Sequence, residues 1–149
     1  MSRDRDPKRI ILACALAWIV PGSGHIFLGK KSKGFLFLAI VVLTFSTGLI
    51  LDGRVYLANP KQPLSYLATF ANISLGPLDL IGRQISYDRI IFRYPKEHER
   101  ELYQDVLDRT RARILAVTNE YGTTFLLTAG LMNILLILDA FDLGIGRKT

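Results

Sequence analysis

The sequence predicts an all-α, polytopic integral membrane protein with three to four transmembrane helices, of which the first two form an N-terminal helical hairpin. Half of its 149 residues are hydrophobic, and residues 10–20, 34–51 and 122–138 contain no charged side chain, whereas the segments between them are strongly polar. Soluble proteins distribute apolar residues by helical or strand period, but membrane proteins collect them in long blocks. At this length we expect one membrane domain, residues 1–149.

The hairpin is expected over residues 8–51. Asp6 followed by Pro7 is a typical helix start, because a carboxylate caps free N–H groups and proline suits the first helical position. The block at 10–20 is about half as long as a ~30 Å hydrocarbon core. We therefore expect this helix to continue to Leu28.

The Pro-Gly pair at residues 21–22 is expected to kink this first helix without ending it. Residues 29–34 are too few to do more than reverse the chain, so the second helix should lie antiparallel to the first and end near residue 51.

The segment at 64–82 is ambiguous. It is mostly apolar but contains Gly76-Pro77 and Asp79, so it could be a fourth, broken span, a re-entrant segment or an interfacial helix. The polar insert at 83–121 is expected on the cytoplasmic face, with a surface helix over residues 97–117.

The last transmembrane helix is expected over residues 122–141. Basic residues favour the arrangement with three spans and the N-terminus inside, because the leader and the insert, which carry most of them, then face the cytoplasm. The densely basic turn after the first helix makes this preference modest, and an arrangement of four spans with the N-terminus outside stays open.

Small and polar residues at helix interfaces let membrane helices approach closely. On this ground we assign helix packing and the hairpin turn to Pro21, Gly22, Gly24, His25, Gly29, Gly34, Gly130 and Asn133. Asn133 lies near the middle of its helix, where an amide needs a partner on another helix. For His25 we expect a neutral imidazole that bonds a backbone carbonyl.

Charged residues near the block ends suggest contacts at the membrane boundary. Lys30, Lys31 and Lys33 are expected to contact lipid phosphates. Asp139 and Asp142, at the far end of the last helix, form a possible polar site, as an acid/base couple, a cation site or partners of basic residues such as Arg147.

Several function classes are disfavoured by the sequence. The net charge of +6 resides beside apolar blocks, which favours anionic lipid over nucleic acid as a partner. The single cysteine, Cys14, permits no intrachain disulfide, and no spacing typical of a metal site occurs. Gly24 to Lys30 is spaced like a phosphate-binding loop, but Lys31 stands where that loop needs Ser or Thr. We therefore expect no enzyme, no cofactor and no metal.

Two segments resemble known families. The first segment reads Pro21-Gly22-Ser23-Gly24-His25-Ile26-Phe27-Leu28-Gly29-Lys30 and is followed by Gly34-Phe35-Leu36. It resembles the hairpin of the two-transmembrane-helix (TM-two) domain. The closing segment, from Glu120-Tyr121-Gly122 to Gly146-Arg147-Lys148, is similar to a family of small bacterial membrane proteins of unknown function that share this hairpin. The resemblance implies a multi-pass protein of a bacterial cytoplasmic membrane, with no assigned activity.

The function predicted from these observations is that of a non-catalytic membrane scaffold or interaction module, which acts through helix packing with a second copy or another membrane protein. The alternative is a small transporter or ion-conducting subunit that uses His25, Asp79 or Asp139 beside the Pro-Gly break, as discontinuous helices do in transporters.

Overall fold

Within the residues that the computed structural model describes, 6–93 and 118–147, every regular element is a helix. Isolated β-bridges occur in this part of the chain, but no strand does. The all-α prediction is therefore confirmed. The helices are α1 Pro7–Ile19, α2 Ser23–Phe27, α3 Lys31–Ile50, α4 Leu64–Ile73, α5 Pro77–Tyr87 and α7 Thr118–Gly144.

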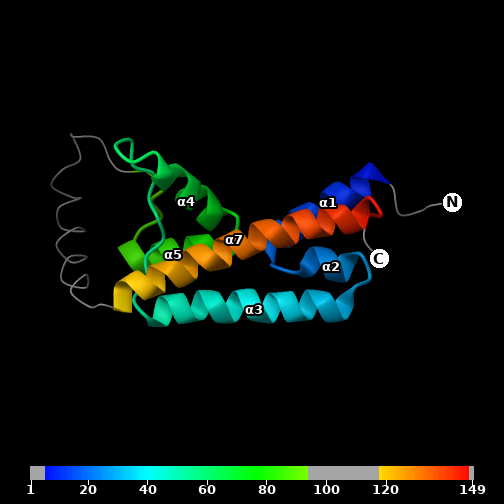
Figure 1. The fold of residues 1–149 in the computed structure, drawn as a ribbon, viewed down its shortest axis with the longest axis horizontal. Coiled ribbons are helices and arrows are strands. Elements are labelled where there is room, and N and C mark those ends of the chain that lie inside the picture. The colour runs from blue at the N-terminus through cyan, green and yellow to red at the C-terminus, as the bar shows by residue number, and fades with distance from the viewer. Residues whose placement is uncertain (1–5, 94–117, 148–149) are drawn as a thin grey trace.

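Helices α3 and α7 are the longest described elements, with 20 and 27 residues. At ~1.5 Å per residue they are about 30 and 40 Å long, which is enough to cross a hydrocarbon core. They pack against each other along the long axis of the molecule (Figure 1). Their directions are opposite, because Gly48 near the end of α3 lies against Leu126 near the start of α7.

The first apolar block is broken where a continuous helix was expected. Helix α1 begins as predicted, with the side chain of Asp6 accepting a hydrogen bond from the backbone N–H of Lys8, but it ends at Ile19. Val20 is extended, and Gly22 has a φ of +80°, a conformation that L side chains rarely adopt. The expected continuation to Leu28 is therefore wrong.

Helix α2 runs back along α1 toward the end from which α1 entered. A Cβ atom on Gly24 would overlap the carbonyl oxygen of Ala13, and the ring of Phe27 lies 5.9 Å from the guanidinium carbon of Arg9. Two helices that continued in one direction could not make these contacts. The start of α1 and the turn before α3 consequently lie at the same end of the molecule, not at opposite ends (Figure 1).

The ambiguous apolar segment forms a second broken pair. Helices α4 and α5 are bent by 118° at Gly76, which has a φ of +59°. Both helices contact the same loop: Thr69 of α4 donates to the carbonyl oxygen of Tyr56, and Tyr87 of α5 donates to that of Val55. The chain thus enters and leaves this segment at one end of the molecule.

The same order of elements, a broken pair followed by a long helix, therefore occurs twice. The first pair enters from the end that carries Asp6, and the second enters from the opposite end (Figure 1). Their tips meet, because the indole Nε1 of Trp18 donates to the carbonyl oxygen of Ile73 at 3.0 Å and a Cβ on Gly76 would overlap the carbonyl oxygen of Trp18. We call this meeting point the junction: Trp18, Ile73, Ser74, Gly76 and Asn133.

A buried apolar cluster joins α3, α7 and the tip of α4: Val41, Phe45, Leu75, Leu126, Ala129 and Leu136. Outside this cluster, glycines allow close backbone contacts. Cβ atoms on Gly130 and Gly53 would overlap Ala71 and Gly122 respectively, so no larger residue fits at either position without moving a helix.

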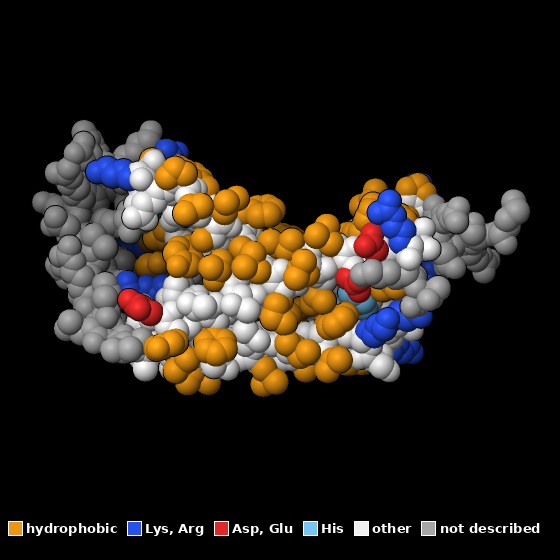
Figure 2. All heavy atoms as spheres, in the orientation of Figure 1, with side chains coloured by type: hydrophobic (Ala, Val, Ile, Leu, Met, Phe, Trp, Pro, Cys, Tyr) orange, Lys and Arg blue, Asp and Glu red, His pale blue; other side chains and the backbone are white. Residues whose placement is uncertain are grey.

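The surface is apolar between two charged ends. Figure 2 shows hydrophobic side chains across the middle of the molecule, with Lys, Arg, Asp and Glu gathered toward its two ends. Leu43 of α3 and Leu135 of α7 are 66% and 64% exposed. Soluble monomers rarely expose such broad apolar patches, whereas a bilayer covers them.

By length and composition, two of the described helices, α3 and α7, could each cross a membrane. The number of candidate spans rises to three if the bent pair α4–α5 counts as one span. The predicted count of three to four spans is not confirmed by this part of the chain. Residues 94–117 of the predicted polar insert, with its surface helix, lie outside the described residues.

A substitution at Gly130 tests the close contact between α4 and α7. Replacing a helical glycine with alanine normally stabilises a helix by about 0.5–1 kcal/mol. Here we expect Gly130→Ala to destabilise the protein by about 1–3 kcal/mol, because the new methyl group displaces the α4 backbone. Thermal unfolding in detergent measures the change, with Thr128→Ala, at an exposed site on the same helix, as the control. Equal or higher stability of Gly130→Ala would show that α4 does not pack there.

Candidate functional site

A histidine and a carboxylate meet at the end of the molecule where α2 and α7 come together. The Nε2 atom of His25 lies 2.9 Å from Oδ2 of Asp139, although the two residues are 114 positions apart in the sequence. The side chain of His25 is fully buried, and that of Asp139 is 25% exposed. The expected backbone-carbonyl partner of this imidazole is therefore replaced by a carboxylate.

Close packing of small residues fixes the position of this histidine. Gly24, the residue before it, lies against Ala13 and Ala17 of α1 and Ala140 of α7, with no room for a Cβ atom. On its other side the imidazole meets the ring of Phe37 edge-on, with 4.9 Å between ring centroids. The side chain thus has one orientation, in which it faces α7.

The two ring nitrogens of His25 have different surroundings. Nε2 shares a hydrogen bond with the Asp139 side chain, and an ionised carboxylate there would accept it. The buried Nδ1 has no partner among the described residues.

The other charged residues predicted at this end lie nearer the surface. Asp142 lies 3.9 Å from Arg147, the basic partner named as one alternative from the sequence. Lys31 and Lys33 are exposed at the start of α3, and Lys30 is half-buried in the turn before it. These lysines stand where a headgroup layer would lie if α3 spans the membrane.

The predicted glycines and proline differ in what they do. Pro21 is buried at the break in the first pair, and Gly22 and Gly34 pack so closely that a Cβ on either would clash with the backbone of the other. A Cβ atom on Gly29 would meet nothing within 4 Å, but the φ of +88° at the turn into α3 is one that L side chains rarely adopt.

The amide of Asn133 in the middle of α7 serves both broken pairs at the junction. Its Nδ2 donates to the carbonyl oxygen of Ser74 at 2.5 Å and lies 3.4 Å from that of Ala17. The hydroxyl group of Ser74 donates in turn to the carbonyl oxygen of Gly130 at 2.7 Å. The last carbonyl groups of a helix lack partners within it, so these side chains satisfy groups that the breaks leave exposed.

A third polar cluster holds Asp79, the other candidate named from the sequence. Arg83 donates from Nε to Oδ2 of Asp79 at 2.7 Å and from Nη1 to the carbonyl oxygen of Ile91 at 2.5 Å, and its guanidinium lies 4.4 Å from the ring of Phe92. Asp79 and Arg83 are both buried. Sequence reasoning placed Arg83 in the polar insert and missed this pair. The signal was its spacing of four residues from Asp79.

Among the described residues no group of three His, Cys, Asp or Glu side chains is placed to hold a metal ion. The structure brings His25 and Asp139 together and keeps Asp79 with Arg83 in α5, where Asp79 lies in the first turn after the junction. The three residues proposed for a transport role thus belong to two separate polar clusters.

Most of the chain, residues 12–149, matches a protein family that is described as a family of unknown function (DUF6677). No curated protein and no solved structure matches the chain.

Replacing Asn133 tests the role of its amide at the junction. Asn133→Leu has a similar volume but leaves the carbonyl oxygen of Ser74 without its donor, so we expect a loss of about 1–3 kcal/mol in unfolding free energy. The control is Asn119→Leu, which removes an exposed bond to the carbonyl oxygen of Asp52 that water can replace. Chemical denaturation in detergent compares the two. Equal losses would contradict a special role of the junction.

Proposed function

The chain belongs to the DUF6677 family, which confirms the predicted membership of a family of unknown function. We propose that the protein is a non-catalytic integral membrane scaffold or interaction module. It acts by presenting apolar helix faces to other molecules inside the bilayer. The observation that carries this proposal is the apolar surface of α3 and α7 between two charged ends (Figure 2).

The packing of the interior supports a structural role for its polar groups. The tips of the two broken pairs are in backbone contact, and Trp18 and Asn133 bond the helix ends to each other. Polar groups that satisfy one another in this way hold a shape. A rigid body with apolar walls suits a protein that binds neighbours by shape within a membrane.

The proposed setting is a cytoplasmic membrane, bacterial as the sequence resemblance implies. Lys30, Lys31 and Lys33 would contact anionic headgroups at the end of the molecule that carries the start of α3. The partner in the bilayer would be a second copy of the chain or another membrane protein, and nucleic acid is not expected.

A small transporter or ion-conducting subunit is the second candidate, and one observation favours it. Two Gly/Pro-broken pairs that enter from opposite ends and meet in the middle are typical of transporter folds, in which broken helices form the central site. The pair of His25 and Asp139 would then exchange protons. The scaffold is preferred because that pair lies near one end, away from the junction.

Proton flux distinguishes the two candidates. We expect vesicles that contain the protein to lose an imposed pH gradient no faster than empty vesicles, as reported by an entrapped pH-sensitive dye. We expect Asp139→Asn and the matched control Asp142→Asn to give the same rate. Flux above that of empty vesicles, lost in Asp139→Asn and kept in Asp142→Asn, would reject the scaffold in favour of the transporter.

A positive readout for the scaffold comes from cross-linking in native membranes. A photoreactive phenylalanine analogue in place of Leu43, on the exposed face of α3, should yield a discrete adduct whose mass identifies a second copy or another protein. The same analogue in place of Phe45, which is 3% exposed on the same helix, should yield none. Adducts with lipid alone from the first position would contradict the proposal.

A further inference from the structure

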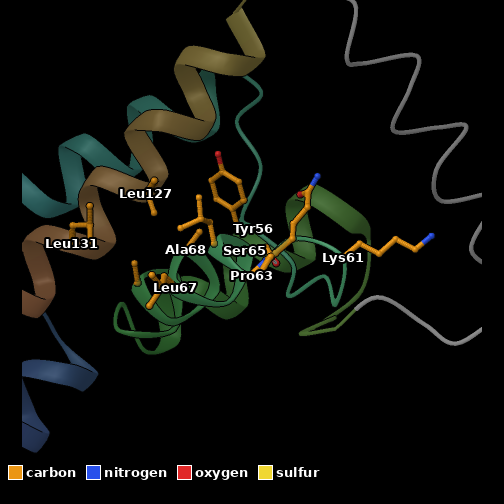
Figure 3. A pocket seen from close by; sticks show the side chains of 11 residues that line it. Tyr56, Lys61, Pro63, Ser65, Leu67, Ala68, Leu127 and Leu131 are labelled. Atoms are coloured by element: carbon orange, nitrogen blue, oxygen red, sulfur yellow. Dashed lines mark hydrogen bonds between the residues drawn. The ribbon is translucent and has the colours of Figure 1, made fainter.

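Helix α4 has a buried polar face in addition to its apolar one. The apolar face borders a groove between α4 and α7, which Ala68 and Leu131 line from its two sides (Figure 3). Thr69 and Asn72 are buried but do not line this groove. Because they are three residues apart on a helix, they share one face. That face carries hydroxyl and amide groups into the interior of the protein.

The polar face of α4 is turned toward α5, because both helices reach the same carbonyl oxygen. Thr69 of α4 donates from Oγ1 to the carbonyl oxygen of Tyr56 at 3.2 Å, and Arg83 of α5 donates to it from Nη1 at 3.4 Å. Asn72 and Asp79 each lie about one helical turn nearer the bend between the two helices. The helices converge at this bend of 118°, so Asn72 and Asp79 lie on its inner side. We call Asn72, Asp79 and Arg83 the bend site.

The bend site holds buried polar atoms that are paired with no described residue. They are Nδ2 and Oδ1 of Asn72, Oδ1 of Asp79 and Nη2 of Arg83, and all three side chains are fully buried. The other carboxylate oxygen of Asp79 and Nε of Arg83 are bonded at 2.7 Å, so the unpaired atoms of these two residues flank one short ion pair. Both atoms of the Asn72 amide are unpaired, so exchanging its oxygen and nitrogen would not satisfy it.

The unpaired atoms define what the bend site can bind. Nη2 of Arg83 and Nδ2 of Asn72 are donors, and the Oδ1 atoms of Asn72 and Asp79 are acceptors. The carboxylate and the guanidinium neutralise each other, so a charged ligand would find no counter-ion there. Buried polar groups are almost always paired with protein or with ordered water. Water is the smallest molecule that both donates and accepts, and a buried water typically joins several polar groups.

We propose that ordered water occupies the bend site and joins Asn72 of α4 to the pair of Asp79 and Arg83 of α5. This water connects the two halves of the second broken pair beside their bend. A lipid tail offers neither a donor nor an acceptor, and a second copy of the chain cannot reach fully buried atoms. The inference rests on burial and hydrogen bonding alone, so it does not depend on the scaffold role.

Solution NMR of the full chain in detergent micelles, labelled with nitrogen-15 at asparagine only, tests this proposal. The side-chain amide signal of Asn72, identified by its absence in Asn72→Gln, should show nuclear Overhauser effects to water with the sign of a long-lived complex. The control is the amide of Asn119, whose bond to the carbonyl oxygen of Asp52 is exposed, and which should show only rapidly exchanging surface water. Lack of long-lived water at Asn72 would refute the proposal.

Thermal unfolding in detergent gives a second, independent test. Asn72→Leu keeps the volume of the side chain but removes both amide atoms. If water pairs this amide, the variant loses those bonds and leaves the water with fewer partners, so we expect the unfolding midpoint to fall by about 2–4 °C. Asn119→Leu should change the midpoint less. A midpoint of Asn72→Leu equal to or above that of the wild type would overturn the proposal, because burying an unpaired amide is less stable than burying leucine.

Discussion

In the proposed membrane setting, one constraint governs the structure: a helix that stops inside a hydrocarbon layer must have its exposed backbone groups satisfied by the protein itself. Helices α1 and α4 both stop near the middle of the molecule, where their ends meet (Figure 1). The amide of Asn133 and the indole of Trp18 supply the donors. In the proposed bilayer, loss of these side chains would leave carbonyl groups at the ends of both broken pairs without a donor.

The same constraint explains why glycines surround the junction. Side-chain donors reach backbone carbonyls only if the helices lie close, and Gly76 and Gly130 permit that approach where a Cβ atom would clash. The long helices α3 and α7 then supply most of the buried apolar side chains that pack beside the broken pairs. The outcome is a buried apolar cluster beside a hydrogen-bonded junction, under an apolar exterior, and on this ground we favour a packing role over a conducting one.

The features that could be predicted from the sequence are those that local composition determines. Uncharged blocks indicated the helices, and Asp6-Pro7 indicated where the first begins. The break at residues 20–22 was mistaken for a kink, because a Pro-Gly pair is compatible with both. Contacts with Ala13 and α7, distant in sequence, decide between them. For the same reason no local signal could identify Asp139 as the partner of His25. The likeness to the TM-two hairpin remains a prediction.

The central claim, that each broken pair returns to the end from which it entered, is tested most directly by labelling single cysteines in sealed vesicles. In a Cys14→Ala background, a membrane-impermeant maleimide should modify Lys8→Cys and Ser32→Cys from the same face and Lys61→Cys from the other. Modification of Lys8→Cys and Ser32→Cys from opposite faces would contradict the account, because α1 and α2 would then form a kinked span through the bilayer.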